Sequence, residues 1–388
     1  MNNRKLFFLG LIIFFVQNLH SQVTFVINKL PNNTPKNTSI YISGNFEGWT
    51  GGQESYKLFQ DEGTYSITIP KQVGSIEFKF TQGSWDSVEV DENGNSIANR
   101  TYTFNAKDES VIINIQNWYD GSLEKDKPST VSKNVSILSE NFFIPQLNKT
   151  RKIWLYLPPD YKTSTKKYPV IYMHDGQNLF DEANSFSGEW EVDETLDKLF
   201  EENGFGAIVI GIDNCGVKRL DEYSPWVNEK YGGGEGKDYV QFIVETLKPF
   251  VDKNYRTKPE VENTAIIGSS MGGLISFYAV MSHPTIFGMG GVFSPSFWFS
   301  DESFEFAKIN GNLNTTKIYF LGGANEGGNE TFKEINKTAQ DLYKMDRVLK
   351  SQGFNVENTT IKIVPEGEHN EKLWRENLEA ALLWLFKN

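Results

Sequence analysis

Short runs of alternating hydrophobic and polar residues fill the first part of the chain, after its N-terminal segment. Tyr65, Ile67 and Ile69 alternate with polar neighbours, and similar runs begin at Ile76 and Val111. A period of two is typical of strands with one buried face. Clusters of proline, asparagine and glycine separate the runs, and no helical periodicity interrupts them. The pattern predicts a small all-β sandwich.

The pattern changes beyond Val135, where continuous apolar runs alternate with amphipathic ones. Continuous apolar runs suit strands buried on both faces, and apolar residues at intervals of three and four suit helices. The expected strands are Ile153–Leu157, Tyr168–Met173, Ala207–Ile212, Thr264–Ile267, Gly290–Phe293, Lys317–Leu321 and Thr359–Val364. The expected helices are Trp190–Phe200, Val240–Val251, Leu274–Val280, residues 331–349 and Glu371–Phe386. This alternation predicts a doubly wound, mostly parallel α/β domain.

The N-terminal segment has the pattern of a secretory signal peptide. Arg4 and Lys5 precede an apolar run from Leu6 to Val16, and small polar residues follow near Ser21. The run is too short to span a bilayer, and no later segment reaches that length. We therefore expect a secreted or periplasmic protein without a membrane span. The expected parts are a signal peptide (1–21), a β-sandwich module (22–118), a polar linker (119–136) and the α/β domain (137–388).

Charge and composition exclude several classes of function. The formal net charge is −12 and no basic stripe is present, so nucleic acid is not an expected partner. Cys215 is the single cysteine, which rules out an intramolecular disulfide, and it is a poor candidate nucleophile because no histidine is near it in sequence. The four histidines show no metal-binding spacing, so we expect neither a metal nor a cofactor. The sequence leaves the oligomeric state open.

The strongest chemical motif is T-A-I-I-G-S-S-M-G-G, from Thr264 to Gly273. It places G-x-S-x-G between a predicted strand and a predicted helix, the context of a nucleophile elbow. Glycines two residues before and two after the serine are needed because a side chain at either position would collide with the neighbouring strand or helix. The motif predicts that Ser270 is a catalytic nucleophile.

A serine nucleophile of this type needs a base, an acid and an oxyanion hole. His369 lies between the last strand and the last helix and is the expected base, whereas His174 and His283 fit structural positions better. Glu326 follows the strand that should carry the acid, and Glu330 is the alternative.

The expected oxyanion donors are two backbone N–H groups. One belongs to Met271, the residue after the serine. The other comes from the loop after Tyr168–Met173, where Gln177 is the first choice and Gly176 the alternative. A glycine-rich stretch, Tyr231–Gly236, lacks the ending of a phosphate loop and is expected near the entrance of the site.

Two tryptophans of the β module lie in turn-like surroundings. Trp49 ends the stretch I-Y-I-S-G-N-F-E-G-W, and Trp85 follows the strand I-E-F-K-F. They either cap the sandwich core or present flat faces for sugar rings to stack on. These phrases, with N-R-T-Y at Asn99–Tyr102, resemble starch-binding-type carbohydrate-binding modules. The resemblance implies that Trp49 and Trp85 form a sugar-binding platform.

Several phrases of the second domain occur in the order typical of one hydrolase family. They are R-K-I-W-L-Y-L-P-P-D-Y (151–161), Y-P-V-I-Y-M-H-D-G-Q-N-L-F-D (168–181), R-L-D-E-Y-S-P (219–225), I-I-G-S-S-M-G-G-L (266–274), S-P-S-F-W (294–298) and H-N-E-K-L-W-R (369–375). Together they resemble the "putative esterase" family of α/β-hydrolases, which includes feruloyl, acetyl and enterochelin esterases. The resemblance implies a triad of Ser270, Glu326 and His369.

The combined expectation is a secreted serine carboxylesterase that removes acetyl or feruloyl groups from carbohydrate. Arg219 and Trp298 are further candidates for the substrate pocket. One alternative is an esterase of ferric siderophore trilactones, which leaves the tryptophan module unexplained. Another is a carbohydrate-binding protein whose hydrolase domain is inactive. The sequence names neither the acyl group nor the glycan.

Overall fold

The computed structural model describes residues 22–387, except 48, 62, 72–74, 95, 96, 98, 106, 120–127, 186, 187, 312–315 and 327–335. The expected signal peptide, residues 120–127 of the expected linker, and Glu330 therefore lie outside the described residues.

The N-terminal module is built from two main sheets packed on a common core. One sheet has the order β3 (Phe59–Asp61), β4 (Thr64–Pro70), β1 (Gln22–Lys29) and β8 (Glu109–Asn114). The other has the order β2 (Tyr41–Gly44), β5 (Ser75–Thr81) and β7 (Arg100–Thr103), and β6 (Glu89–Val90) pairs with β9 (Asn117–Trp118). Phe25 and Phe78 pack across the two sheets with ring centroids 4.6 Å apart. The expected all-β fold is confirmed.

The second part of the chain is organised around an eight-stranded sheet. Its order is β10 (Val135–Ile144), β11 (Lys149–Tyr156), β13 (Ile208–Ile212), β12 (Val170–His174), β16 (Thr264–Ser269), β17 (Met289–Phe293), β18 (Lys317–Gly323) and β19 (Thr359–Val364). The pairs β10–β11 and β11–β13 are antiparallel, and every later pair is parallel. Because parallel strands direct their carboxyl ends to one edge, the loops after β12, β16, β18 and β19 lie on the same side of the sheet.

Helices cover both faces of this sheet, as alternate residues of β12 show. Ile171 and Met173 belong to one core, packed against α1 (Val192–Asn203) and α8 (Glu371–Leu385). Tyr172 belongs to the other, packed against helices of the opposite face. These are α3 (Gly236–Phe242), α4 (Lys248–Asn254), α5 (Met271–Ser282), α6 (Glu302–Asn310) and α7 (Lys337–Ser351). The expected α/β-hydrolase architecture is confirmed. Within the described residues, none of the helices combines the length and apolar character that a bilayer crossing needs.

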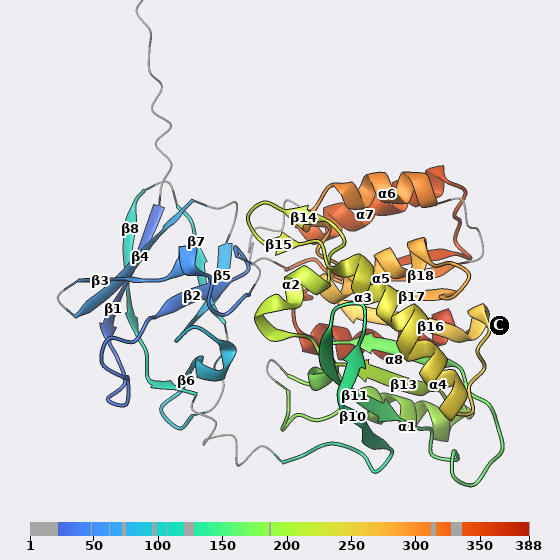
Figure 1. Ribbon diagram of the computed structural model, residues 1–388. Helices are drawn as coiled ribbons and strands as arrows, with labels where there is room; N and C mark the ends of the chain where they lie inside the picture. Colours follow the sequence, from blue (N-terminus) through green and yellow to red (C-terminus); the bar gives the residue numbers. More distant parts are fainter. Residues whose placement is uncertain are drawn as a thin grey trace, which may run out of the picture.

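The β module contacts the hydrolase part through the hairpin of β14 (Val227–Asn228) and β15 (Gly232–Gly233), which lies beside β5 in Figure 1. Two hairpin side chains reach the carbonyl oxygen of Phe46: Tyr231 Oη at 2.5 Å and Lys230 Nζ at 3.2 Å. The Lys230 ammonium also lies 5.4 Å from the ring centroid of Tyr56. In return, Gln53 Nε2 donates to the Lys230 carbonyl at 3.3 Å. The expected glycine-rich loop is thus part of the contact between the two folded parts.

Candidate active site

Ser270 occupies a sharp turn between β16 and α5. Its backbone has φ 57° and ψ −122°, a conformation that residues other than glycine rarely adopt. A Cβ on Gly268 would lie 2.6 Å from the carbonyl oxygen of Gly272, so the turn can close only with a glycine there. A residue held in such a conformation costs about 1–3 kcal/mol, which the surrounding packing must offset. The turn leaves the Ser270 side chain half-exposed at the carboxyl end of the sheet.

His369 and Glu326, which are 43 residues apart in the chain, form a hydrogen-bonded pair. His369 Nδ1 lies 2.9 Å from Glu326 Oε2. Glu326 is 6% exposed, and its Oε1 accepts a hydrogen bond from the Gly323 N–H at 2.7 Å. The loops after β18 and β19 therefore bring together the two residues that the sequence selected as acid and base. Glu330, the alternative acid, lies outside the described residues.

Three further residues contact Glu326, His369 or Ser270. Ser294, at φ 42° just after β17, donates its hydroxyl to Glu326 Oε1 and accepts a hydrogen bond from Trp374 Nε1 at 3.0 Å. The Trp374 ring meets the His369 ring edge to face, with centroids 5.3 Å apart. Ser296 Oγ lies 3.3 Å from Ser270 Oγ. Sequence reasoning assigned no role to these residues, although S-P-S and H-N-E-K-L-W carried part of the family resemblance.

The Ser270 hydroxyl faces Ser296, and among the described residues it makes no hydrogen bond to His369. In enzymes without bound substrate, such catalytic hydrogen bonds are often long and tighten only when substrate is present. In this structure His369 is therefore hydrogen-bonded to Glu326, whereas Ser270, at the same edge of the sheet, is hydrogen-bonded to Ser296.

The electrostatics of the His369–Glu326 pair favour the charged form of both groups. Burial alone would lower the pKa of His369, but the charge and hydrogen bond of Glu326, with Glu77 and Glu371 nearby, raise it above its ordinary value. Burial would likewise raise the pKa of Glu326, yet the His369 charge and hydrogen bonds from His369, Ser294 and Gly323 hold it below its usual range. Glu77 belongs to β5, so the N-terminal module contributes to the field at His369.

The expected oxyanion groups lie where two loops meet. Met271 opens α5, and the first N–H groups of a helix have no partner within it. Gly176 and Gln177 form a helical turn after β12. A Cβ on Gly176 would lie 2.9 Å from the backbone N of Asp213, so a side chain there would push this loop away. Gln177 Oε1 accepts a hydrogen bond from the Asn214 N–H at 3.2 Å, which fixes the Gln177 side chain against the loop that follows β13.

Arg219 is bound to this same loop. Its Nε and Nη2 donate to the two carboxylate oxygens of Asp175 at 2.7 and 2.8 Å, and Asp175 sits at φ 56° just before Gly176. Asp175 is 7% exposed. A bidentate pair of this kind fixes geometry as well as charge. The Arg219 side chain therefore holds the loop that carries the candidate oxyanion donors.

The remaining titratable candidates occupy structural positions. His174 is 2% exposed and hydrogen-bonds Tyr239 Oη at 2.9 Å, and burial lowers its pKa to about 3. His283 is the C-cap residue of α5. Burial raises the pKa of the Cys215 thiol to about 12, which removes its thiolate at neutral pH.

The structure brings the two tryptophans of the module together. The Trp49 and Trp85 ring centroids are 5.9 Å apart with planes 36° apart, and Trp85 Nε1 donates to the Trp49 carbonyl at 2.9 Å. Both side chains are half-buried. Trp298 lies elsewhere, 37% exposed, with its ring edge-on to Tyr231 at 5.5 Å between centroids. Through Tyr231, Trp298 adjoins the contact between module and hydrolase part.

Comparison with known proteins identifies the hydrolase part. A family model described as "Putative esterase" matches residues 144–385, more than half of the chain. An uncharacterized protein, YbbA of Bacillus subtilis, is 29% identical over 243 residues, covering 61% of this chain and 92% of its own length. The endo-1,4-beta-xylanase/feruloyl esterase of Xylanibacter ruminicola is 24% identical over 257 residues, which is 65% of this chain but only 31% of that protein.

The N-terminal region matches a different class of protein. It is similar to the alpha-amylase of Niallia circulans, which is 37% identical over 100 residues, covering 25% of this chain and 8% of the amylase. Among solved structures, the enterobactin esterase FES from Shigella flexneri superimposes with a TM-score of 0.52 at 17% identity. That likeness covers 94% of this chain and 93% of the other, so it includes both folded parts.

The electrostatics of the site lead to a prediction that does not depend on substrate. We expect the His369 imidazole to titrate above 6.5, because Glu326 stabilises its protonated form. Glu326→Gln removes that charge and should move the His369 pKa down, whereas His174 should stay neutral in both proteins until far lower pH. Imidazole NMR shifts followed against pH measure both residues.

Glu368→Gln is the matched control, because Glu368 is the exposed carboxylate adjacent to His369 in the chain. It should leave the His369 pKa nearly unchanged. Equal downward shifts in the two variants would contradict a specific pairing with Glu326.

Proposed function

Since this chain belongs to the putative esterase family, we propose that it acts as a serine carboxylesterase with Ser270 as nucleophile, His369 as base and Glu326 as acid. The chain is a hydrolase of carboxylic esters. The observation that carries the serine mechanism is the combination of Ser270 at φ 57° with a His369–Glu326 hydrogen bond of 2.9 Å on the same sheet edge.

The proposed reaction begins when an ester carbonyl carbon reaches Ser270 Oγ. The hydroxyl turns from Ser296 towards His369, whose Nε2 takes the proton as the Oγ–carbon bond forms. Negative charge then develops on the carbonyl oxygen. The backbone N–H groups of Met271 and of Gln177 or Gly176 are the proposed donors to it. Arg219, by fixing Asp175, keeps that loop in place.

In the following steps His369 gives up the proton that it took from Ser270, and water then removes the acyl group. His369 returns its proton to the leaving alcohol oxygen as the ester bond breaks, and an acyl group remains on Ser270. Water then gives a proton to His369 and attacks the acyl carbon, and His369 returns that proton to Ser270 Oγ as the bond to the acyl carbon breaks and the acid is released. Glu326 stabilises the imidazolium in both steps and keeps the Nδ1 proton directed at itself. Its own orientation depends on Ser294 and the Gly323 N–H.

Acyl esters on carbohydrate are the proposed substrates, with acetyl and feruloyl as the candidate acyl groups. A relative that combines xylanase and feruloyl esterase in its name supports this choice, as does the amylase-like N-terminal region. The Trp49–Trp85 pair is the proposed sugar platform, because paired indoles offer a broad apolar face for a sugar ring. Trp298 is the proposed aromatic wall nearer the reacting ester.

The organisation proposed for this activity follows from the same features. A signal peptide of residues 1–21 would export the protein to where polysaccharide is found. The module of 22–118 and the linker of 119–136 would precede the esterase domain of 137–388. The module is docked on the β14–β15 hairpin, so it would present carbohydrate at a fixed orientation to the esterase site.

Removal of the Ser270 hydroxyl tests the serine mechanism. Ser270→Ala should reduce kcat for 4-nitrophenyl acetate by about 10⁴-fold or more, because the nucleophile is lost while the fold is kept. The same assay with methyl ferulate and a ferric trilactone separates a carbohydrate esterase from a siderophore esterase. Preferential turnover of the trilactone would favour the second candidate.

Ser282→Ala, at the far end of the same helix α5, is the control and should keep wild-type turnover. If Ser270→Ala and wild type hydrolyse the acetate ester equally, the serine mechanism is wrong. A wild-type protein inactive on all three esters would favour a carbohydrate-binding protein without hydrolase activity.

The sugar platform is tested by binding to insoluble starch and insoluble xylan. Trp49→Ala and Trp85→Ala should each weaken binding by about 5-fold or more, as truncation of a central aromatic contact commonly does. Phe59→Ala is the control, since Phe59 is 69% exposed on β3 of the same module and pairs with no other ring among the described residues. Undiminished binding by both tryptophan variants, or an equal loss in Phe59→Ala, would discard the platform.

A further inference from the structure

Three carboxylates gather at the start of α1, away from the Ser270 turn. They belong to Glu189, Asp193 and Glu194, and one oxygen of each lies within 4.8 Å of the others. Glu189 is 2% exposed and Asp193 is fully buried. Three like charges held this close in a poorly solvated place repel one another and lose hydration, so they need a compensating partner.

Each of the three also has an oxygen with no hydrogen-bond donor among the described residues. These atoms are Glu189 Oε1, Asp193 Oδ1 and Glu194 Oε2. Buried polar atoms in folded proteins nearly always have a partner, which is a protein group, an ordered water or a bound ion. Because each of the three carboxylates has one such oxygen, we interpret them as the ligands of one shared group.

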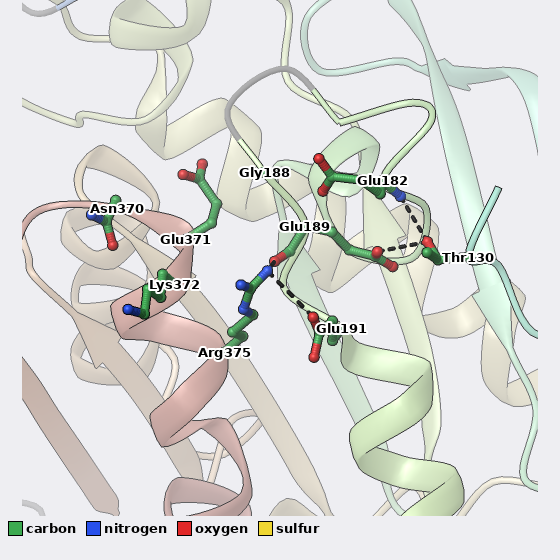
Figure 2. A pocket seen from close by; sticks show the side chains of 9 residues that line it. All are labelled: Thr130, Glu182, Gly188, Glu189, Glu191, Asn370, Glu371, Lys372 and Arg375. Atoms are coloured by element: carbon green, nitrogen blue, oxygen red, sulfur yellow. Dashed lines mark hydrogen bonds and ion pairs between the residues drawn. The ribbon is translucent and has the colours of Figure 1, made fainter. Parts of the chain in front are cut away.

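No side chain among the described residues supplies the missing positive charge, because none of the three carboxylates takes part in an ion pair with lysine or arginine. Arg375 is the basic residue beside this cluster. Its Nη1 lies 3.3 Å from the Glu191 carboxylate and 3.4 Å from the Glu189 backbone carbonyl. Figure 2 shows that the Glu189 carboxylate is directed away from Arg375, towards Thr130. The Arg375 guanidinium therefore pairs with the Glu191 carboxylate and does not neutralise the cluster.

We propose that Glu189, Asp193 and Glu194 bind a calcium ion. The donor set is oxygen only, which suits hard cations. Calcium takes oxygens at about 2.3–2.6 Å, so two of its ligands lie at most about 5 Å apart, and the three oxygens, all within 4.8 Å of one another, are close enough to share one ion. Magnesium keeps several waters and needs shorter, octahedral distances, which a buried carboxylate cluster satisfies less well.

An adjoining cavity of about 490 Å³ gives the ion an entry path and room for waters. Its lining includes Glu189 and Thr130 on one side and Glu371 and Arg375 of α8 on the other, as Figure 2 shows. Of the three cluster residues, Glu189 is the one that lines this cavity.

Calcium at this position would tie the chain that enters the hydrolase part to its first helix. Thr130 Oγ1 donates to Glu189 Oε2 at 2.6 Å, and the Ser132 N–H donates to Asp193 Oδ2 at 2.7 Å. The Thr130 N–H donates to Asp181 at 3.1 Å. Residues 130–132 lead directly into β10, so the ion would hold the carboxylates that anchor this segment. The role is structural, and no step of ester hydrolysis passes through it.

The test uses the full-length protein, freed of metal by EDTA and exchanged into chelator-free buffer. Calcium chloride should raise the melting temperature by about 3 °C or more, because an ion that binds only the folded state stabilises it. Magnesium chloride should raise it much less. Terbium chloride should give luminescence sensitised by the neighbouring Trp190, and calcium should displace it. The measurements are made at about pH 8.5, since burial raises the pKa of Glu189 to about 7 and that of Glu194 to about 8, and protons compete below this range.

Asp193→Asn and Glu194→Gln should abolish the calcium response and the terbium signal. In EDTA they should melt at or above the wild-type temperature, because removing one charge relieves the repulsion. Glu191→Gln, in the same stretch but outside the cluster, should respond to calcium like wild type. The proposal is overturned if wild type shows no calcium response or terbium signal, if magnesium is equally effective, or if the cluster variants respond as wild type does. A wild type that ignores calcium but gains stability as pH falls would show that protons, not an ion, neutralise the cluster.

Discussion

The conformation of a single residue, Ser270, sets the requirements for the rest of the hydrolase part. A positive φ at a serine is unfavourable, so β16 and α5 must be packed tightly enough to hold it. Residues from Thr264 to Ser269 are all buried between neighbouring strands, and α5 is buried along almost its whole length. Gly268 and Gly272 allow the strand and helix to meet without a side chain between them. The buried strand and helix thus hold the strained turn in place. The turn positions Ser270 at the sheet edge where the loops after β12, β18 and β19 also lie.

The second constraint is the buried carboxylate of Glu326. A charge that is 6% exposed is tolerated only when donors surround it, and here Gly323, Ser294 and His369 do so. This arrangement holds the pKa of Glu326 below its usual range, so the carboxylate stays charged beside His369. It also raises the pKa of His369, which the docked β module reinforces through Glu77. The two folded parts are therefore electrostatically linked at the proposed site as well as in contact at the hairpin.

Much of the fold could be predicted because it depends on local pattern. The central strands are continuous apolar runs such as Ile208–Ile212, and the last helix has a clear helical period. The short helix α6 was missed because Phe304 and Phe306 alternate like strand residues. Ser294, Ser296 and the Glu77 contribution depend on tertiary contacts between distant segments, which no local spacing reveals. The docking of the module through Lys230 and Tyr231 was not predicted either, because the residue types of the glycine-rich stretch do not show which distant segment it contacts.

The central claim is that Ser270 carries the acyl group during turnover. The most direct measurement mixes the protein with 4-nitrophenyl acetate, quenches with acid within the first turnovers and maps the modified peptide by mass spectrometry. The account predicts an acetyl group on Ser270 in the wild-type protein and its absence in His369→Ala, where no base activates the serine. Acetylation confined to other residues, or labelling of Ser270 that is as fast without His369, would contradict it.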